Sequence, residues 1–207
     1  MAPSNLLTVT AVVAVTHAMQ AEAPRPPLDL IQSNASHQDF EAPSPFDVAI
    51  TRTILVPGNI QEVFDFVAAE GVLPEVLTGF GLVPSVVSTS DVAGPWDKPG
   101  SSRTVHLAGG STAHEEVKAY SRPSYFAYRV SNPTFSLRYL MAHARGQWWF
   151  SSVKGGTSVR WTYTFRAKGM LTKLPLTLFA RTQWTGYMDV CLKNVVAHFG
   201  HTGTRHT

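Results

Sequence analysis

The pattern of apolar and polar positions first becomes regular at residue 46. In FDVAITRTILV, residues 46–56, apolar and polar residues alternate and β-branched ones are frequent, which predicts a strand with one buried face. From Val83 to about Lys168 similar patterns return as six further strands, separated by turns such as Gly109-Gly110 and Gly155-Gly156. Seven strands are therefore expected.

Helical spacing is found on both sides of this β-rich region. Asn59 is suited to cap a helix, with Glu62 three residues later; this helix is expected to reach about Glu70, and a second short helix follows over 73–77. Near the end of the chain, apolar residues recur at steps of four, three, four and four, which predicts a long amphipathic helix over 171–199. They are Trp184, Met188, Cys191, Val195 and Phe199.

This order of elements indicates an α+β domain, in which a seven-stranded curved antiparallel sheet wraps around a long C-terminal helix. Such a sheet and helix enclose a volume where a ligand would bind. We expect the domain to cover residues 46–200, with a frayed tail over 201–207. Residues 1–45 are expected to hold a flexible linker rich in Pro, Ala, Ser and Asn.

The apolar run over residues 6–19 has the length of a signal-peptide core, yet no Lys or Arg precedes it. It is too short to span a bilayer, so no stable membrane insertion is expected. Export and a cytoplasmic location both stay open.

Three features of the chain are distinctive: the opening strand followed by PGNIQEVFDFV, then GPWDKPGSSRTVHLAGGSTAHEEV with YSRPSYFAYRVSNP, then GQWWFSSVKGGTSVRWTYTF before the last helix. In these features and their order the chain resembles the SRPBCC superfamily. This is the helix-grip fold of START lipid-binding domains, pollen allergens and polyketide cyclase/dehydrase-like proteins. The resemblance implies an elongated, mostly apolar cavity for a lipid, isoprenoid or polyketide. It carries over no catalytic residue, because the superfamily shares no catalytic signature.

Two neighbouring strands are expected to line this cavity. In SVRWTYTF, residues 158–165, every second residue is large and apolar, so these side chains share one face. A two-residue loop at Gly155-Gly156 would pair Trp161 with Phe150 and Tyr163 with Trp148. The same face then continues through small residues, which leave room for a ligand or for close approach of the last helix. The small residues are Gly146, Ala144 and Ala142, followed by Leu140.

The hairpin around Gly109-Gly110 contains the strongest candidates for acid–base chemistry. A three-residue loop, Gly109-Gly110-Ser111, would place Arg103 and Glu115 on the apolar inner face as diagonal neighbours, and would turn His106, His114 and Glu116 to solvent. A buried carboxylate is costly unless it is paired. Arg103 and Glu115 could therefore only satisfy each other, or they could orient a ligand or move protons.

The candidate catalytic residues are thus Glu115, Arg103 and Tyr163. His143 and Arg145 are expected on the solvated outer face. The candidate ligand-binding residues are Trp148, Phe150, Trp161, Ala142, Ala144, Val105, Leu107, Phe126, Tyr128, Trp184 and Met188.

Composition and charge limit the partners. The formal net charge is only +3, and Lys and Arg form no run and do not interleave with aromatic residues, so nucleic acid is not an expected partner. No cofactor is expected, and no metal site either, since His198, His201 and His206 lack metal-ligand spacing. The oligomeric state is left open.

The expected partner is a hydrophobic small molecule bound in the internal cavity. The alternative is an enzyme, a cyclase or dehydratase acting on a polyketide- or terpenoid-like substrate held in the same cavity. A third function, the handling of membrane lipids or of quinones, would require an exposed apolar rim.

Overall fold

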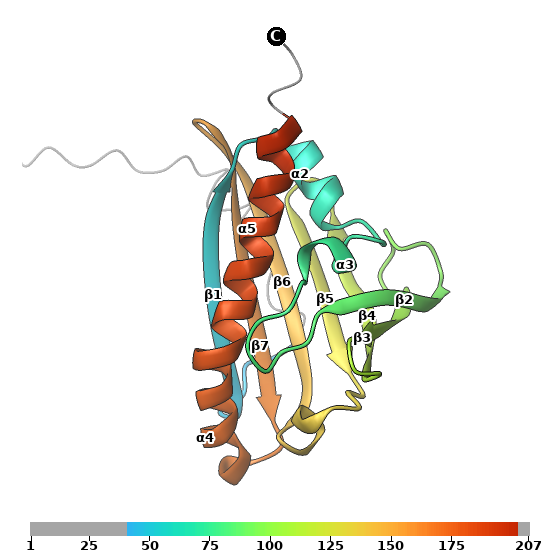
Figure 1. The fold of residues 1–207 in the computed structure, drawn as a ribbon, viewed down its shortest axis with the longest axis vertical. Helices are drawn as coiled ribbons and strands as arrows, with labels where there is room; N and C mark the ends of the chain where they lie inside the picture. The colour runs from blue at the N-terminus through green and yellow to red at the C-terminus, as the bar shows by residue number, and fades with distance from the viewer. Residues whose placement is uncertain (1–40, 203–207) are drawn as a thin grey trace, which may run out of the picture. The chain divides into compact units, whose positions relative to one another are not determined.

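The structure, a computed structural model, describes residues 41–202. Within this range a seven-stranded antiparallel sheet has the order β1-β7-β6-β5-β4-β3-β2 (Figure 1). This confirms the seven predicted strands and their antiparallel pairing. The strands are β1 (Asp47–Val56), β2 (Val86–Ala93), β3 (Ser102–Leu107), β4 (Thr112–Ser121), β5 (Tyr125–Ser131), β6 (Met141–Val153) and β7 (Gly156–Ala167).

Two short helices, α2 (Ile60–Val67) and α3 (Leu73–Val76), follow β1 as predicted. Asn59 caps α2: its side-chain oxygen accepts a hydrogen bond of 2.9 Å from the Glu62 backbone N–H. The helix ends at Val67, three residues before the expected end. A 3₁₀ turn that was not predicted, η1 (Ser136–Tyr139), connects β5 to β6.

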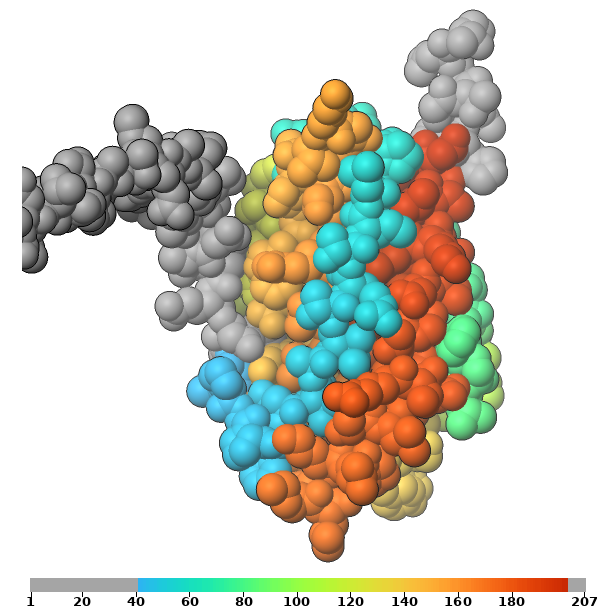
Figure 2. All heavy atoms as spheres, turned by 90° about the vertical axis from the view of Figure 1, so that its left-hand side faces the viewer, coloured from blue at the N-terminus to red at the C-terminus, as the bar shows by residue number. Residues whose placement is uncertain are grey.

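The predicted long helix is present, with a π-helical segment inside it. It consists of α4 (Met170–Phe179), η2 (Ala180–Trp184) and α5 (Thr185–Thr202). Four residues of the predicted apolar face are buried, and Trp184 is partly buried. Helix α5 lies beside β1 (Figure 2), where Arg52 Nε is 2.8 Å from Asp189 Oδ1. The four buried residues are Met188, Cys191, Val195 and Phe199.

The β6–β7 hairpin pairs its residues two positions away from the predicted register. Val153 pairs with Gly156, so the turn residues are 154 and 155, and Trp161 pairs with Trp148 instead of Phe150. The predicted face is nevertheless right, because a shift of two residues leaves every side chain on the same side of the sheet.

The β3–β4 hairpin shows the same kind of difference. Leu107 N–H donates to Ser111 O over 2.8 Å, which closes a three-residue loop over 108–110, one residue earlier than predicted. Arg103 is consequently directly opposite Glu115, not diagonal to it. Both residues are on the inner face, as expected.

Ala142 is the one candidate wall residue that the sheet turns outward. The pairing of β6 with β7 shifts between Met141 and His143, so Ala142 occupies a bulge and is exposed. Met141 is buried in its place. The prediction that Ala142 faces the interior was therefore wrong, because strict alternation along β6 is broken at this residue.

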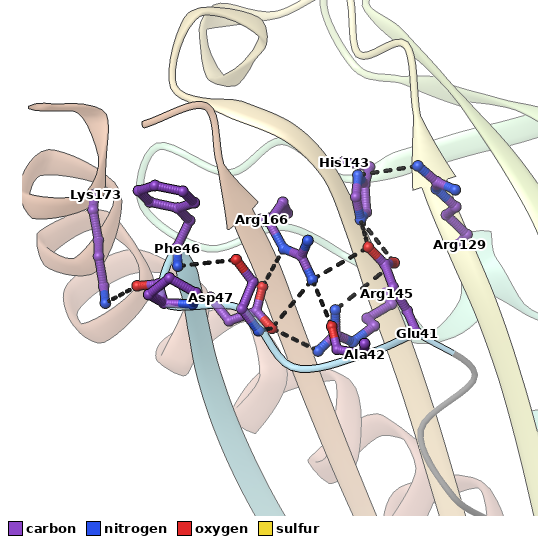
Figure 3. Close-up of polar contacts among 11 residues, drawn as sticks. Glu41, Ala42, Phe46, Asp47, Arg129, His143, Arg145, Arg166 and Lys173 are labelled. Carbon is purple, nitrogen blue, oxygen red and sulfur yellow. Dashed lines mark hydrogen bonds and ion pairs between the residues drawn. The ribbon is translucent and has the colours of Figure 1, made fainter. Parts of the chain in front are cut away.

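His143 and Arg145 lie on the outer face, but the prediction that they are solvated was wrong, since both are buried. Figure 3 shows the cluster that covers them. His143 Nδ1 faces Arg129 Nη2 at 3.1 Å, and its Nε2 is 2.9 Å from the Glu41 carboxylate. Burial and the neighbouring Arg129 lower the pKa of His143, against the opposing effect of Glu41. A neutral imidazole that donates to Glu41 and accepts from Arg129 satisfies this geometry.

Asp47, the first residue of β1, joins the same cluster (Figure 3). Its Oδ2 accepts a hydrogen bond of 2.8 Å from Arg145, and Arg166 also donates to its carboxylate. Burial raises the pKa of Asp47, but these two arginines outweigh that effect and the pKa lies below its ordinary value. The cluster thus holds residues 41–47 against the outer face of β6 and β7.

Candidate functional site

A cavity lies on the inner face of the sheet, closed by α3 and the loop after it, by η1, and by the start of α5. Its space is about 700 Å³ when the open solvent at its mouth is included. About 90 Å³ of it has room for the centre of a water-sized sphere. The wall consists of Leu73, Leu77, Val83, Pro84, Val86, Val105, Leu107, Ala113, Glu115, Tyr128, Val130, Phe135, Leu137, Met141, Trp161, Tyr163, Phe165, Trp184 and Tyr187.

Glu115 is the one charged residue in this wall. It is 3% exposed and Arg103 is 2% exposed. Arg103 Nε and Nη2 both lie 2.6 Å from the same carboxylate oxygen, Oε2. Among the described residues no hydrogen bond is made to the other oxygen, Oε1, so the carboxylate keeps an acceptor available at the cavity.

The Arg103 guanidinium is itself held on two further sides. Its Nη1 donates to the Glu70 backbone oxygen, at the end of the segment that follows α2. Its Cζ lies 3.9 Å from the ring centroid of the buried Trp96, in a cation–π arrangement. These contacts fix Arg103, and through it they fix the position of Glu115.

Three buried tyrosines contribute the other oxygen atoms of the wall. Burial raises the pKa of Tyr128, Tyr163 and Tyr187, and the nearby Glu115 carboxylate raises it further. Their phenols therefore stay protonated at neutral pH. Each can donate a hydrogen bond to a ligand oxygen.

Two tryptophans in the wall carry an unused donor. The indole N–H groups of Trp161 and Trp184 are buried and have no hydrogen-bond acceptor among the described residues. The Trp184 ring packs against Tyr163 with ring centroids 4.4 Å apart, and Trp161 stacks on Trp148 at 4.3 Å. The cavity is thus lined by flat rings with polar atoms at their edges.

A smaller hollow adjoins the cavity at Glu115, Tyr128 and Trp161, which border both spaces. Arg103, Phe126 and Trp148 line this smaller hollow only, as do Val67, Ala69, Val72, Val76, Cys191 and Val195. Glu115 is therefore placed at the junction of the two spaces.

The structure brings together most of the candidate site residues. Seven of them line the main cavity, and three others line the smaller hollow alone. Phe150, Ala144 and Met188 are buried in the core and line neither space, because neighbouring side chains cover them. The seven are Glu115, Tyr163, Trp161, Val105, Leu107, Tyr128 and Trp184.

The row of small residues in β6 does not leave open space. The ring of Tyr128 lies directly over Gly146, where a Cβ atom would collide with the ring and its hydroxyl group. Gly146 is therefore required by a neighbouring tyrosine, and neither of the two expected explanations, a ligand or the last helix, applies at this position.

Several wall residues were not found from the sequence. Tyr187 lies three residues after Trp184 in the same helix, and that spacing was a usable signal. Phe135 and Leu137 belong to the η1 region, where no regular pattern was recognised. Leu77 and Pro84 come from the connection between α3 and β2, whose path over the sheet depends on tertiary packing.

Residues 47–200 match the model of a family described as polyketide cyclase/dehydrase and lipid transport. The chain belongs to this family, which agrees with the SRPBCC resemblance. No curated protein matches the sequence.

Solved structures show the same fold at low sequence identity. Ginseng major latex-like protein 151 from Panax ginseng has a TM-score of 0.58 at 12% identity, covering 74% of this chain and 98% of that one. The structure of Ara h 8.0201 has a TM-score of 0.51 at 15% identity, covering 73% of this chain and 99% of that one. The di-domain ARO/CYC BexL from the BE-7585A biosynthetic pathway has a TM-score of 0.56 at 20% identity, covering 74% of this chain and 50% of BexL.

Proposed function

We propose that the protein binds one apolar small molecule in the cavity, with ring or isoprenoid character and a few oxygen atoms. The observation that carries this proposal is the composition of the wall. It is apolar except for the Glu115 carboxylate and the three neutral tyrosines. An apolar body with a small number of fixed polar contacts is the usual design of a small-molecule site.

The polar atoms of the wall favour a ligand with carbonyl or hydroxyl groups. The phenols of Tyr163 and Tyr187 are donors, and the Trp161 and Trp184 indoles lack acceptors among the described residues. A ligand carbonyl would accept from such donors, and a ligand hydroxyl group could donate to Glu115 Oε1. The matching family description, which includes polyketide chemistry and lipid transport, supports the same class of molecule.

Nile red, a flat neutral dye with a carbonyl oxygen, is a suitable probe. We expect its fluorescence to rise on binding with a stoichiometry of one. The substitution Ala113→Phe places a ring in the cavity and should weaken binding by about ten-fold or more, since it removes the space for one ring of the ligand.

The matched control is His114→Phe, which adds the same side chain at the next position of β4, on the outer face. It should change the affinity by less than about two-fold. Equal binding by the Ala113→Phe variant and the unmodified protein would contradict the proposal, provided that both variants unfold at the temperature of the unmodified protein.

Proton transfer is a second candidate function, favoured by the available Glu115 Oε1 at the cavity. A carboxylate base in an apolar site removes the ring C–H proton of 5-nitrobenzisoxazole. The C–H electron pair forms the nitrile, and the N–O bond breaks with its electron pair on the oxygen, which leaves as a phenolate. We expect the protein to accelerate this ring opening and Glu115→Gln to lose the acceleration. If the unmodified protein does not accelerate the ring opening and Glu115→Gln still binds Nile red, catalysis is rejected and binding remains the function.

A further inference from the structure

Helix α4 presents an apolar face to solvent. Leu171 is 93% exposed, Leu174 78%, Met170 70% and Leu178 65%. With 3.6 residues per turn, these four side chains fall within about 100° of the helix surface. Leu176, on the other side of the helix, is fully buried. The helix is therefore anchored by one face while its opposite face has no contact to cover it among the described residues.

Positive charge surrounds this face. Lys168 precedes the helix, Lys173 lies within it and Arg181 follows it, while residues 167–188 contain no Asp or Glu. Lys168 and Arg181 are exposed. Apolar side chains flanked by cations and without acidic neighbours in sequence are the pattern of a surface that binds anionic lipid.

The turn η1 extends this surface at the same end of the domain. The Lys168 backbone N–H donates to Leu140 O over 3.0 Å, so the start of α4 lies beside the end of η1. Tyr139 in this turn is 63% exposed, and Arg138 packs on its ring at 4.7 Å. Both views show α4 and the segment of η1 at the lower end of the domain (Figures 1 and 2).

We infer that this surface docks peripherally on an anionic phospholipid bilayer. We define the docking surface as Met170, Leu171, Leu174, Leu178 and Tyr139, with the cations Lys168 and Arg181 at its edge. The apolar side chains enter the interface between head groups and acyl chains, and the cations contact lipid phosphates. Because the four exposed side chains lie on one face of α4 and Leu176 is buried on the other, α4 lies in the plane of the interface. None of the described helices is long and apolar enough to cross a membrane.

The size and charge of the surface favour lipid over a second copy of the chain. Four side chains on a single helix form an apolar patch of a few hundred Å², less than the roughly 800 Å² that each partner buries in a typical stable interface. Two copies facing each other through this surface would also bring their Lys168 and Arg181 side chains together, which is unfavourable.

The test is cosedimentation of the full chain with vesicles of phosphatidylcholine containing about one third phosphatidylserine, beside vesicles of phosphatidylcholine alone. We expect the protein to bind the anionic vesicles. The double substitution Leu171→Ser and Leu174→Ser should lower the partition coefficient by about ten-fold or more. Lys168→Gln with Arg181→Gln should lower it by about ten-fold on anionic vesicles only, an effect that disappears at high salt.

The matched control is Leu55→Ser with Val153→Ser, which removes two exposed apolar side chains at the C-terminal ends of β1 and β6. Figure 1 shows these strand ends at the opposite end of the sheet from α4. It should leave the partition coefficient within about two-fold. Failure of the unmodified protein to sediment with either vesicle, or unchanged binding by the two-leucine variant, would overturn the inference. A third contradicting result would be that the unmodified protein is a dimer in sedimentation velocity without lipid and that the two-leucine variant is a monomer. Because the vesicle is the only probe, these outcomes are independent of the cavity ligand.

Discussion

Arg103 and Glu115 are paired across β3 and β4, and two nitrogens of the guanidinium bind a single oxygen of the carboxylate. Both side chains are almost completely excluded from solvent. The pair therefore does two things at once. It neutralises a buried charge in the cavity wall, and it leaves Glu115 Oε1 without a hydrogen bond among the described residues.

Removing one member of this pair should destabilise the fold strongly. In Arg103→Met the Glu115 carboxylate stays buried without its partner, and we expect the free energy of unfolding to fall by about 3–5 kcal/mol. The double variant Arg103→Met with Glu115→Leu removes both charges and should be more stable than Arg103→Met alone. Urea unfolding of the four proteins of this cycle measures the coupling, and additive single effects would show that the pair does not act as a unit.

The outer cluster should make stability depend on pH through His143. Its folded-state pKa is below the ordinary 6.5, so the unfolded chain takes up a proton first as the pH falls through 6.5, and stability decreases below that value. His143→Gln cannot titrate. We expect it to be less stable than the unmodified protein at about pH 7.5, and the gap to narrow towards about pH 5. Unfolding in urea at both pH values tests this, and a gap that widens at low pH would show that the histidine is protonated in the folded state.

Gly146 should resist substitution by alanine, although alanine is normally acceptable in a strand. An added Cβ would meet the Tyr128 ring, so Gly146→Ala should lower the free energy of unfolding by about 1–3 kcal/mol. Gly71→Ala is the control, because nothing lies within 4 Å of its added Cβ; thermal unfolding should detect little change there. The double variant Gly146→Ala with Tyr128→Leu removes the ring that the added Cβ would meet. A free energy of unfolding higher than that of Gly146→Ala alone would identify the ring as the cause.

The sequence was sufficient to predict the seven strands, the two short helices and the long C-terminal helix in their order, and the inward faces of β3, β4, β6 and β7 except at Ala142. It was not sufficient for the pairing register, because alternation has a period of two and a shift of two residues, as between Trp161 and its partner, keeps every face unchanged. The bulge at Ala142 interrupts alternation without a Gly or Pro to signal it. Such features depend on contacts between strands.

The outer cluster and the docking surface were beyond prediction for a related reason. Glu41 is about a hundred residues away from His143 and Arg145 in sequence and meets them only when the sheet has formed. This contact buries a face of the sheet that the sequence alone predicts to be solvated. In α4, the sequence predicted an amphipathic helix. The end of β7 at Ala167 determines where α4 begins. It therefore determines which leucines of the long helix extend past the sheet and are exposed.

Native mass spectrometry of the protein isolated from its own host would show whether the cavity holds one apolar small molecule. We expect a single additional mass that is lost on denaturation, present in the unmodified protein and in His114→Phe, and absent in Ala113→Phe. Unmodified protein without any bound molecule, or an equal additional mass on Ala113→Phe, would contradict it.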